Sequence, residues 1–187
     1  MVFLCFDTET TGLLDDCNVL TAYFIILDND LNEIASLDLK IKHNCYKVQI
    51  KALEINKIDL IEHDKISITK KEAKDQLEQF LSKYKNNDKY IPLGHNIAFD
   101  LKMLKNNQLL SDSAIECYIS PNSIDTLTIA KFVKSCNKIP IKQSLSLVNL
   151  CKFLNIELNS ELDAHNAEYD IRLTIELFKV LQNMIEK

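Results

Sequence analysis

The sequence predicts an α/β fold, in which one mixed sheet is flanked by helices. Three apolar, β-rich runs come first, at residues 2–6, 20–27 and 34–41, and strand-like and helix-like segments alternate after them. Early hairpins followed by βα units are typical of one layered domain. The chain has 187 residues, 47% of them hydrophobic, which is enough for one sizeable core. No repeat, linker or low-complexity stretch divides it, so we expect a single domain over residues 1–187.

The middle of the chain predicts a helix, a short strand and a second helix. Apolar residues recur at helical spacing over residues 69–84, and Thr69 is placed to cap the start of this helix. Residues 90–93 resemble a short buried strand that ends at Gly94. The second helix is predicted over residues 98–105, before two asparagines that are typical of a helix end.

Further helices are predicted in the last third of the chain. Asp125 can cap a helix that runs through Val133, and Ser144 can start another that runs through Leu154. The last helix is predicted to begin within residues 163–166 and to continue almost to the end.

The net charge and the cysteines argue against several classes of protein. A formal net charge of -5 and a pI near 5.4 argue against a broad basic surface for nucleic acid. An acidic enzyme can still bind nucleic acid if metal ions contact the phosphates. The six cysteines are scattered without a C-x-x-C pair, so we expect neither a zinc site nor a disulfide scaffold and interpret them as reduced.

The sequence shows no recognisable targeting or membrane segment. The apolar run at residues 2–6 is stopped by Asp7, which is too early for a signal peptide. No later segment approaches the length of a membrane span. We therefore expect a protein that is cytoplasmic or otherwise intracellular, is not secreted and has no membrane partner.

Two carboxylates stand at the end of the first predicted strand. Asp7 and Glu9 are two residues apart, and the two-residue period of a strand projects both side chains from the same face. Two like charges are thereby placed side by side.

Two more carboxylates lie on the apolar faces of predicted helices. Asp100 is followed by Met103 and Leu104 at i+3 and i+4, which puts the acid on a face that should point inward. Asp170 repeats this pattern with leucines at i+3 and i+7. An ionised carboxylate in such a place costs several kcal/mol unless it is paired or metal-bound.

Each acid taken alone has an ordinary explanation, because an aspartate often caps a helix or pairs with a lysine. For all four acids together this explanation is poor. The chain contains a single arginine, Arg172, so bidentate guanidinium pairing cannot neutralise four carboxylates. Hard divalent cations with oxygen ligands are the simpler partner. The acids therefore predict a site for Mg²⁺ or Mn²⁺.

Three segments resemble the motifs of one enzyme family. Residues 6–13 read Phe-Asp-Thr-Glu-Thr-Thr-Gly-Leu, residues 94–100 read Gly-His-Asn-Ile-Ala-Phe-Asp, and residues 165–170 read His-Asn-Ala-Glu-Tyr-Asp. In this order they resemble the motifs of the DEDDh family of 3'-5' exonucleases, which includes the proofreading epsilon subunit of bacterial DNA polymerase III. Weaker similarity, as at residues 52–58, extends the resemblance over nearly the whole chain. Lys57 is a departure, because members of the family commonly carry glycine there.

The resemblance implies a ribonuclease H-like exonuclease fold, with a mixed sheet of five strands. Three of these strands would be antiparallel and two further strands parallel. It also implies two divalent metal ions as cofactors. Asp7 would bridge both ions, and Glu9 and Asp170 would complete one of the two sites. Asp100 would hold the second ion mainly through water.

The resemblance further implies that His165 is the general base that takes a proton from the attacking water. The unperturbed pKa of histidine, about 6.5, suits this role at neutral pH. His165 and Asp170 are five residues apart, which is about 140° around a helix, so His165 must precede the helix or lie in its first turn. Without the motif, a histidine at a helix start is usually a surface or capping residue.

Five further residues are candidates for substrate binding. Thr10 and Leu13 follow the first strand, where a turn would expose backbone donors and an apolar wedge to the 3'-terminal nucleotide. His95, Asn96 and Phe99 are placed to line the nucleotide path, and Phe99 offers an aromatic face for stacking. Ordinary core packing is an open alternative for both Leu13 and Phe99.

The preferred function is release of nucleoside 5'-monophosphates from the 3' end of single-stranded or frayed DNA. The same chemistry on RNA, as in RNase T-like members of the family, is the alternative, because nothing in the sequence identifies a contact to a 2'-hydroxyl group. A third hypothesis is an inactive nucleic-acid-binding module. The chain ends soon after the last predicted helix, so we expect a free-standing enzyme or a module with a polymerase or replication partner that the sequence does not identify.

Overall fold

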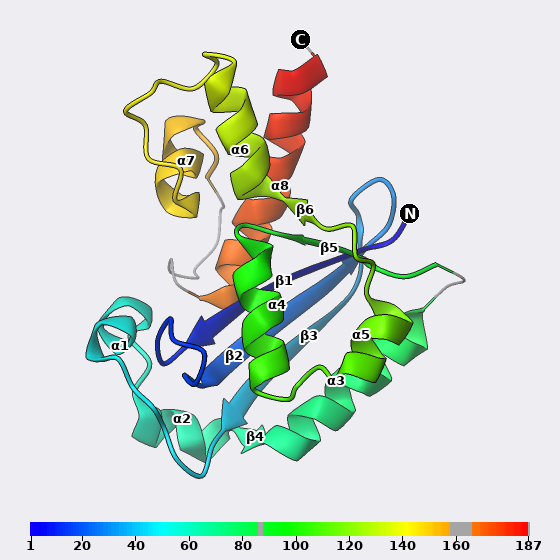
Figure 1. Ribbon diagram of the computed structural model, residues 1–187, viewed down its shortest axis with the longest axis vertical. Coiled ribbons are helices and arrows are strands. Elements are labelled where there is room, and N and C mark those ends of the chain that lie inside the picture. Colours follow the sequence, from blue (N-terminus) through cyan, green and yellow to red (C-terminus); the bar gives the residue numbers. More distant parts are fainter. Residues whose placement is uncertain (86–87, 158–165, 187) are drawn as a thin grey trace.

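The computed structural model describes residues 1–85, 88–157 and 166–186. In these residues a six-stranded mixed sheet has the order β4-β3-β2-β1-β5-β6 (Figure 1). The strands are β1 Phe3–Thr10, β2 Val19–Leu27, β3 Glu33–Lys42, β4 Ile68–Thr69, β5 Ile91–Gly94 and β6 Ile124–Asp125. Strands β1, β2 and β3 are antiparallel neighbours, whereas β5 pairs parallel with β1, β6 with β5, and β4 with β3.

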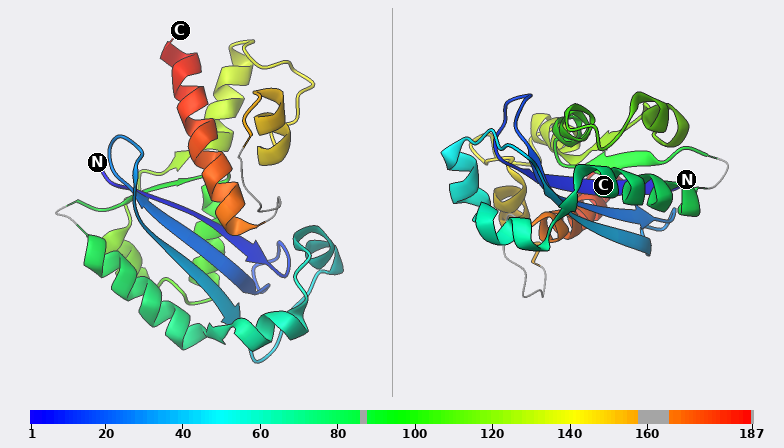
Figure 2. Two further views of the ribbon diagram at one scale, coloured as in Figure 1. Left: turned by 180° about the vertical axis from the view of Figure 1, so that it is seen from behind. Right: turned by 90° about the horizontal axis from the view of Figure 1, so that it is seen from below.

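Helices pack on both faces of this sheet (Figures 1 and 2). Their bounds are α1 Ile50–Asn56, α2 Leu60–Ile66, α3 Lys70–Tyr84, α4 Ile97–Asn106, α5 Asp112–Tyr118, α6 Thr126–Ser135, α7 Leu147–Phe153 and α8 Ala167–Glu186. One core lies between the sheet and α3, α4 and α5, and it includes Leu4 and Phe6 of β1. A second core lies between the opposite face and α8, and it includes Phe3 and Cys5. Successive residues of β1 therefore alternate between α4 and α8.

Helix α8 also packs on α6 and α7 through its other side. Leu173, Leu177 and Leu181 share a third core with Val133 of α6 and Leu150 of α7. The apolar stripe of α8 is thus wide enough to contact the sheet and a helical layer at once. This packing fixes the start of α8 beside the carboxyl end of β1 (Figure 1).

Most of the predicted elements are confirmed at or near their expected bounds. The clearest case is α3, where Thr69 Oγ1 accepts the N–H of Glu72 at 3.2 Å and the Glu72 carboxylate accepts the N–H of Thr69 at 2.8 Å. This reciprocal capping box satisfies backbone donors that the helix leaves unpaired. Asp125 likewise caps α6 by accepting the N–H of Leu127.

Three details of the predicted fold are wrong. The sheet has six strands instead of five, because the two-residue strand β4 is added parallel to the edge of β3, and so short a strand leaves no periodic pattern. Helix α7 starts at Leu147 instead of Ser144. The hydroxyl groups of Ser144 and Ser146 bond to each other before the helix, and serines of this kind compete with helical backbone bonds. The seven-residue helices α2 and α5 were not expected.

Lys57 ends α1 in the left-handed region, with φ 57° and ψ 24°. Its N–H donates to the carbonyl oxygen of Leu53 at 2.9 Å, so the turn forms although glycine is absent. The left-handed conformation brings Cβ close to the following carbonyl oxygen and costs about 1–2 kcal/mol. The departure from the family pattern at this position is therefore a local energetic cost and leaves the turn in place.

Replacing Lys57 by glycine is expected to raise the free energy of unfolding by about 0.5–1 kcal/mol. The same change at Lys51, inside α1, is expected to lower it by about 1 kcal/mol, because glycine is a poor helix former. Urea unfolding of the two variants measures the difference. Equal destabilisation by both changes would contradict the left-handed assignment.

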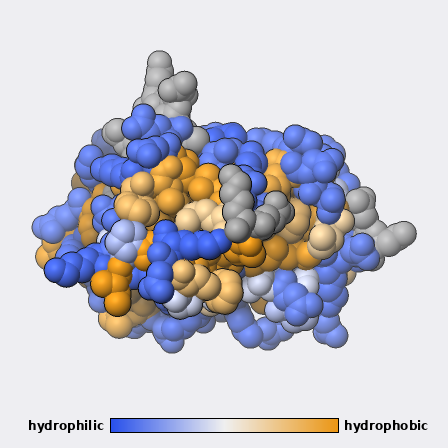
Figure 3. Space-filling view, turned by 90° about the horizontal axis from the view of Figure 1, so that it is seen from above, coloured by the Kyte–Doolittle hydropathy of each residue, from blue (hydrophilic) through white to orange (hydrophobic). Residues whose placement is uncertain are grey.

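The carboxyl-terminal ends of α6 and α8 expose apolar surface. Figure 3 shows apolar residues gathered across this face between hydrophilic borders. Large apolar side chains that are more than half exposed in these elements and the loop after α6 are Phe132, Ile141 and Ile185. Ile185 lies 15 residues beyond Asp170, which is about 22 Å along α8.

Within residues 1–85, 88–157 and 166–186, no helix combines the length and apolarity needed to cross a membrane.

Candidate active site

Two acids stand on the face of β1 that α8 covers. Phe3 and Cys5 point to this face and pack in the same cluster as Ile175 of α8. Asp7 and Glu9 continue the alternation, which brings both carboxylates to the carboxyl end of β1. Both acids are partly buried. The prediction that these two side chains share one face is confirmed.

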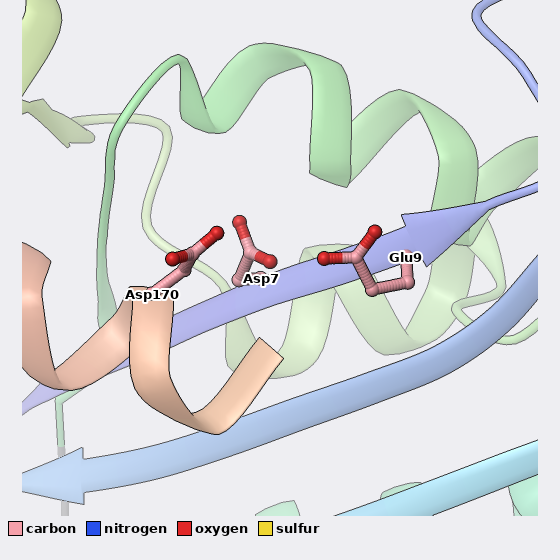
Figure 4. A group of neighbouring side chains, drawn as sticks. All are labelled: Asp7, Glu9 and Asp170. Carbon is pink, nitrogen blue, oxygen red and sulfur yellow. The ribbon is translucent and has the colours of Figure 1, made fainter. Parts of the chain in front are cut away.

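The third carboxylate comes from the first turn of α8. Asp170 is 9% exposed, and the leucines at i+3 and i+7 are buried as predicted. Carboxylate oxygens of Asp7, Glu9 and Asp170 lie within 4.8 Å of one another. In Figure 4 the carboxylates of Asp7 and Asp170 point toward each other, and Glu9 lies further along β1. Segments from the two ends of the chain therefore form one acidic group.

Asp100 approaches β1 from the opposite face of the sheet. It is 4% exposed in α4, and Met103 and Leu104 are fully buried on the same side of the helix. Asp100 Oδ1 accepts hydrogen bonds from the backbone N–H of Thr8 at 3.0 Å and from Thr8 Oγ1 at 2.7 Å. Thr8 alternates with the two acids of β1 and so points toward α4. Asp100 thus adjoins the three-carboxylate group without belonging to it.

Burial and mutual repulsion raise the pKa values of these acids. Desolvation is the largest effect on Glu9, and together with the charge of Asp170 it raises the pKa to about 8. The pKa of Asp7 is raised well above its usual value by desolvation and then by the charges of the other three acids. Desolvation raises the pKa of Asp100 to about 7, although the hydrogen bonds from Thr8 oppose the shift. Without a cation, the group therefore retains protons near neutral pH.

The metal-free protein is expected to lose stability as the pH rises from 5 to 8. The pKa of Glu9 is about 8 in the folded protein and about 4.3 in an unfolded chain. Between these values the folded state binds more protons than the unfolded state, so the free energy of unfolding falls with increasing pH. Urea unfolding in EDTA should show a smaller fall for Glu9→Gln, which cannot titrate at this position. Parallel pH profiles for the two proteins would contradict the shift.

The charges around the acidic group suit a bound cation. Within the described residues, no lysine or arginine forms an ion pair with Asp7, Glu9 or Asp100. The single arginine pairs elsewhere, with the carboxylates of Glu33 at 3.1 Å and of the nearby Glu168 at 2.8 Å. Carboxylate oxygens are hard donors of the kind that Mg²⁺ and Mn²⁺ prefer. The residues present therefore fit divalent metal ions.

The acidic group and the sheet agree with what is found in known proteins. The family model described as Exonuclease, that of RNase T, matches residues 4–178. The chain belongs to this exonuclease family. It is a 3'-5' exonuclease domain of the DEDD type and, by family, a phosphodiester hydrolase. Exonucleases of the DEDD type use divalent metals, and the chain carries a matching acidic group in Asp7, Glu9 and Asp170.

The exonuclease is similar to parts of larger proteins. It is 28% identical over 182 residues to the PolC-type DNA polymerase III of Ureaplasma parvum serovar 3, covering 97% of this chain and 11% of that protein. Escherichia coli Exonuclease I in complex with a dT13 oligonucleotide superposes with a TM-score of 0.80 at 22% identity, over 97% of this chain and 41% of that one. Exonuclease I from Methylocaldum szegediense gives a TM-score of 0.75 at 18% identity, over 97% and 40% of the two chains. The ribonuclease H-like exonuclease fold is therefore confirmed.

His165, the expected general base of the exonuclease, lies outside the described residues. The structure does place the start of α8. The side-chain oxygen of Asn166 accepts the backbone N–H groups of Glu168 at 3.0 Å and of Tyr169 at 3.4 Å, as a helix cap does. Helix α8 begins at Ala167, after the position of His165. The role of His165 stays a prediction.

The end of β1 and the turn after it carry the two candidates for contact with the terminal nucleotide. Thr10 is buried, and its hydroxyl group donates to the carbonyl oxygen of Gly12 at 2.7 Å. Leu13 is 75% exposed, so its alternative assignment to the core is wrong. Its N–H donates to Gln49 Oε1 at 2.7 Å. The turn therefore has a rigid base and an exposed apolar tip.

The remaining candidates lie where β5 leads into α4. The ring nitrogens of His95 bond to Thr126 Oγ1 and to the carbonyl oxygen of Leu145, both at 2.9 Å, and burial lowers the pKa of the ring. A direct hydrogen bond from His95 to a nucleotide would have to replace one of these bonds. Asn96 is exposed. Phe99 is partly buried against the core beneath α4, as the packing alternative expected.

Sequence reasoning missed three residues that support the site. Thr8 holds Asp100, and its position between two motif acids is a signal that was available in the sequence. Gln49 precedes α1 and Asn56 is its last residue, and they bond to the turn after β1 and to the end of β1. No periodic pattern marks them, because these contacts depend on where α1 docks. Asn56 alone has a signal, the adjacent Lys57 position, where members of the family commonly carry glycine.

Proposed function

We propose that the chain removes nucleotides one at a time from the 3' end of single-stranded or frayed DNA and releases nucleoside 5'-monophosphates. The observation that carries this proposal is the group of three clustered carboxylates, with raised pKa values for its two acids on β1, in an exonuclease fold. Such a group is unfavourable without cations and suits the binding of phosphates through them. The proposal treats residues 1–187 as one catalytic domain.

The metal centre would be held by the four acids in the arrangement that the family resemblance implies. Asp7 would contact both ions, Glu9 and Asp170 one of them, and Asp100 the other through water. Two bound divalent ions stabilise the attacking and the leaving oxygen of an in-line phosphodiester displacement. The hydrogen bonds from Thr8 orient Asp100 beside β1, and the packing of α8 orients Asp170.

The remaining catalytic tasks fall to the chain's own side chains. His165 would accept the proton of the attacking water, a role that requires the neutral imidazole. Leu13 would pack against the terminal base, and the fixed turn beside Thr10 would position the sugar. Asn96 and Phe99 would border the preceding nucleotide, and His95 would hold the segment that carries them.

DNA is the favoured substrate because of the proteins that share this fold. The polymerase relative is a DNA polymerase by name, and the matched Exonuclease I structure holds a dT13 oligonucleotide. The same polymerase relative favours a replication partner for this chain. The RNase T family description keeps RNA as the second candidate.

The test is degradation of end-labelled single-stranded DNA and RNA oligonucleotides of the same sequence, with free and with blocked 3' ends. We expect a ladder from free 3' ends of DNA in Mn²⁺, no products in EDTA and no products from blocked ends. Faster degradation of RNA would select the ribonuclease alternative. Absence of products from every substrate, with binding retained, would select the inactive binding module.

A further inference from the structure

The lysines and the acids of the chain are unevenly distributed. Residues 126–156 contain five lysines and no aspartate or glutamate, whereas the rest of the chain contains the other 17 basic residues and all 27 acidic residues. This is the longest stretch of the chain without an acid. It comprises α6, α7 and the loops that follow them, and we call it the basic lobe (Figure 1). A chain of net negative charge thus has a local region of positive charge.

Nearby acids do not neutralise the basic lobe. In the part of the chain that the structure describes, none of its five lysines forms an ion pair. Lys134 donates to the carbonyl oxygen of Gln143 at 2.8 Å. Lys138 donates to the carbonyl oxygen of Met184. The other three lysines are exposed: Lys131, Lys142 and Lys152. Their ammonium groups are therefore free to contact phosphates.

Two phenylalanines of the basic lobe are exposed. Phe132 of α6 is 58% exposed, and Phe153, the last residue of α7, is 39% exposed. The six other phenylalanines, all among the described residues, are buried or partly buried. Each exposed ring directly follows an exposed lysine, Lys131 or Lys152. Positive charge beside aromatic faces is the combination that binds the phosphates and the bases of a single strand.

The basic lobe begins beside the acidic group and reaches the far end of α8. At its near end, the carbonyl oxygen of Leu145 accepts a hydrogen bond from His95 Nε2 at 2.9 Å, and α7 packs on α8. At its far end, Lys138 bonds to Met184, which lies 14 residues beyond Asp170, or about 21 Å along the helix. This length corresponds to about six phosphates of one strand, at about 3.4 Å each.

We propose that the basic lobe binds the single strand of the DNA substrate upstream of its 3'-terminal nucleotides, with the lysines on phosphates and the two phenylalanines stacked on bases. This inference rests on the proposed function, because it assumes that the 3' end lies at the acidic group. An acidic protein segment would also suit a positive surface. The two exposed rings beside lysines favour a nucleic acid, which supplies both phosphates and bases.

The first experiment measures binding of a labelled single-stranded DNA oligonucleotide to the full chain in EDTA, by fluorescence anisotropy over a series of salt concentrations. The combined lysine variant is Lys131→Gln, Lys142→Gln and Lys152→Gln. Each phosphate contact on a single strand contributes about 0.7 to the slope of log affinity against log salt concentration. The variant should therefore lose about 2 from this slope and bind about 100-fold more weakly at about 0.1 M salt.

The matched control replaces three exposed lysines of α3 by glutamine. The control variant is Lys70→Gln, Lys71→Gln and Lys83→Gln. Helix α3 packs against β3, on the other side of β1 from β5 and β6, and lies far from the basic lobe (Figure 1). The control changes the net charge by the same amount as the lysine variant. It should keep the wild-type slope and affinity.

The second experiment tests stacking with Phe132→Leu and Phe153→Leu combined. Leucine keeps an apolar side chain and removes the aromatic face. The double variant should bind about 10-fold more weakly at every salt concentration. Its slope should equal that of wild type, because stacking releases no counterions. The losses in both lobe variants should be larger for a strand of about twelve nucleotides than for one of about four, which is too short to cover the lobe.

Wild-type affinity in either lobe variant would overturn the inference, and so would an equal loss in the α3 control. Such results would leave an acidic protein segment as the partner of the basic lobe. Degradation of DNA in Mn²⁺ tests the proposed function separately. Salt-dependent binding through the lobe without degradation would overturn the proposed function and leave the lobe as a DNA-binding surface, and degradation that is unaffected by both lobe variants would do the reverse.

Discussion

Asp7→Asn is expected to lower kcat by about 10³-fold or more, because it removes a metal ligand that contributes several kcal/mol to transition-state stabilisation. Each loss of about 1.4 kcal/mol lowers the rate tenfold. The substitution keeps the shape of the side chain and removes its charge. It also removes a buried acid whose own pKa is raised by desolvation and by the charges of the other three acids. The variant should therefore fold and be at least as stable as wild type in EDTA. Initial rates on a DNA oligonucleotide in Mn²⁺ measure the loss.

Asp30→Asn is the matched control for Asp7→Asn. Asp30 is exposed in the turn between β2 and β3, beyond the end of β1 that carries Phe3 and far from the end that carries Glu9. The control changes the net charge by the same amount and should keep wild-type rates. Comparable activity in both variants would show that Asp7 has no part in catalysis.

His165→Ala is expected to reduce kcat by about 10²- to 10⁴-fold, the usual contribution of a general base. Mn²⁺ affinity should stay unchanged, because histidine is a base in this scheme and the four acids are the ligands. Imidazole added to the buffer should restore part of the rate by supplying the missing base. Rates in a series of imidazole concentrations measure this rescue.

Two results would argue against the assignment of His165. Loss of Mn²⁺ affinity in His165→Ala would make the histidine a ligand, and a rate within a few-fold of wild type would make it a surface residue. The pH profile is a further check, because the rise in wild-type kcat that reflects histidine deprotonation should be absent from the variant.

Elements with a strong local signal could be predicted from the sequence. Strands β2 and β3 carry long apolar or alternating runs, and the reciprocal cap at Thr69 fixes the start of α3. Gly94 marks the end of β5, where a Cβ atom would lie 2.5 Å from the Ile97 side chain. Such signals lie in residues that are neighbours in the sequence, so they can be recognised without knowledge of the tertiary packing.

Elements that depend on tertiary contacts could not be predicted. Strand β4 has two residues and exists because β3 offers it an edge. Helix α2 buries one side chain, His63, whose ring bonds to the carbonyl oxygen of Ile41. Helices of seven residues are unstable alone. Their positions follow from contacts that leave little periodicity in the sequence.

In the candidate site, too, some features follow from local spacing and others depend on tertiary contacts. The shared face of Asp7 and Glu9 follows from strand geometry, and the inward faces of Asp100 and Asp170 follow from helical spacing. The position of Thr8 between two motif acids is visible in the sequence, but its choice of Asp100 as partner depends on the packing of α4 against the opposite face of β1. The sequence thus predicts which acids turn inward, and the packing decides which of them share one group.

Counting bound Mn²⁺ tests the metal centre most directly. The electron paramagnetic resonance signal of free Mn²⁺ would be followed during titration of metal-free wild type, Asp7→Asn and Asp30→Asn, with a nucleoside 5'-monophosphate present. The account predicts saturable loss of the free-ion signal in wild type and Asp30→Asn, and no such loss in Asp7→Asn. Equal binding by all three proteins, or binding by none, would contradict a metal centre built on the acids of β1 and α8.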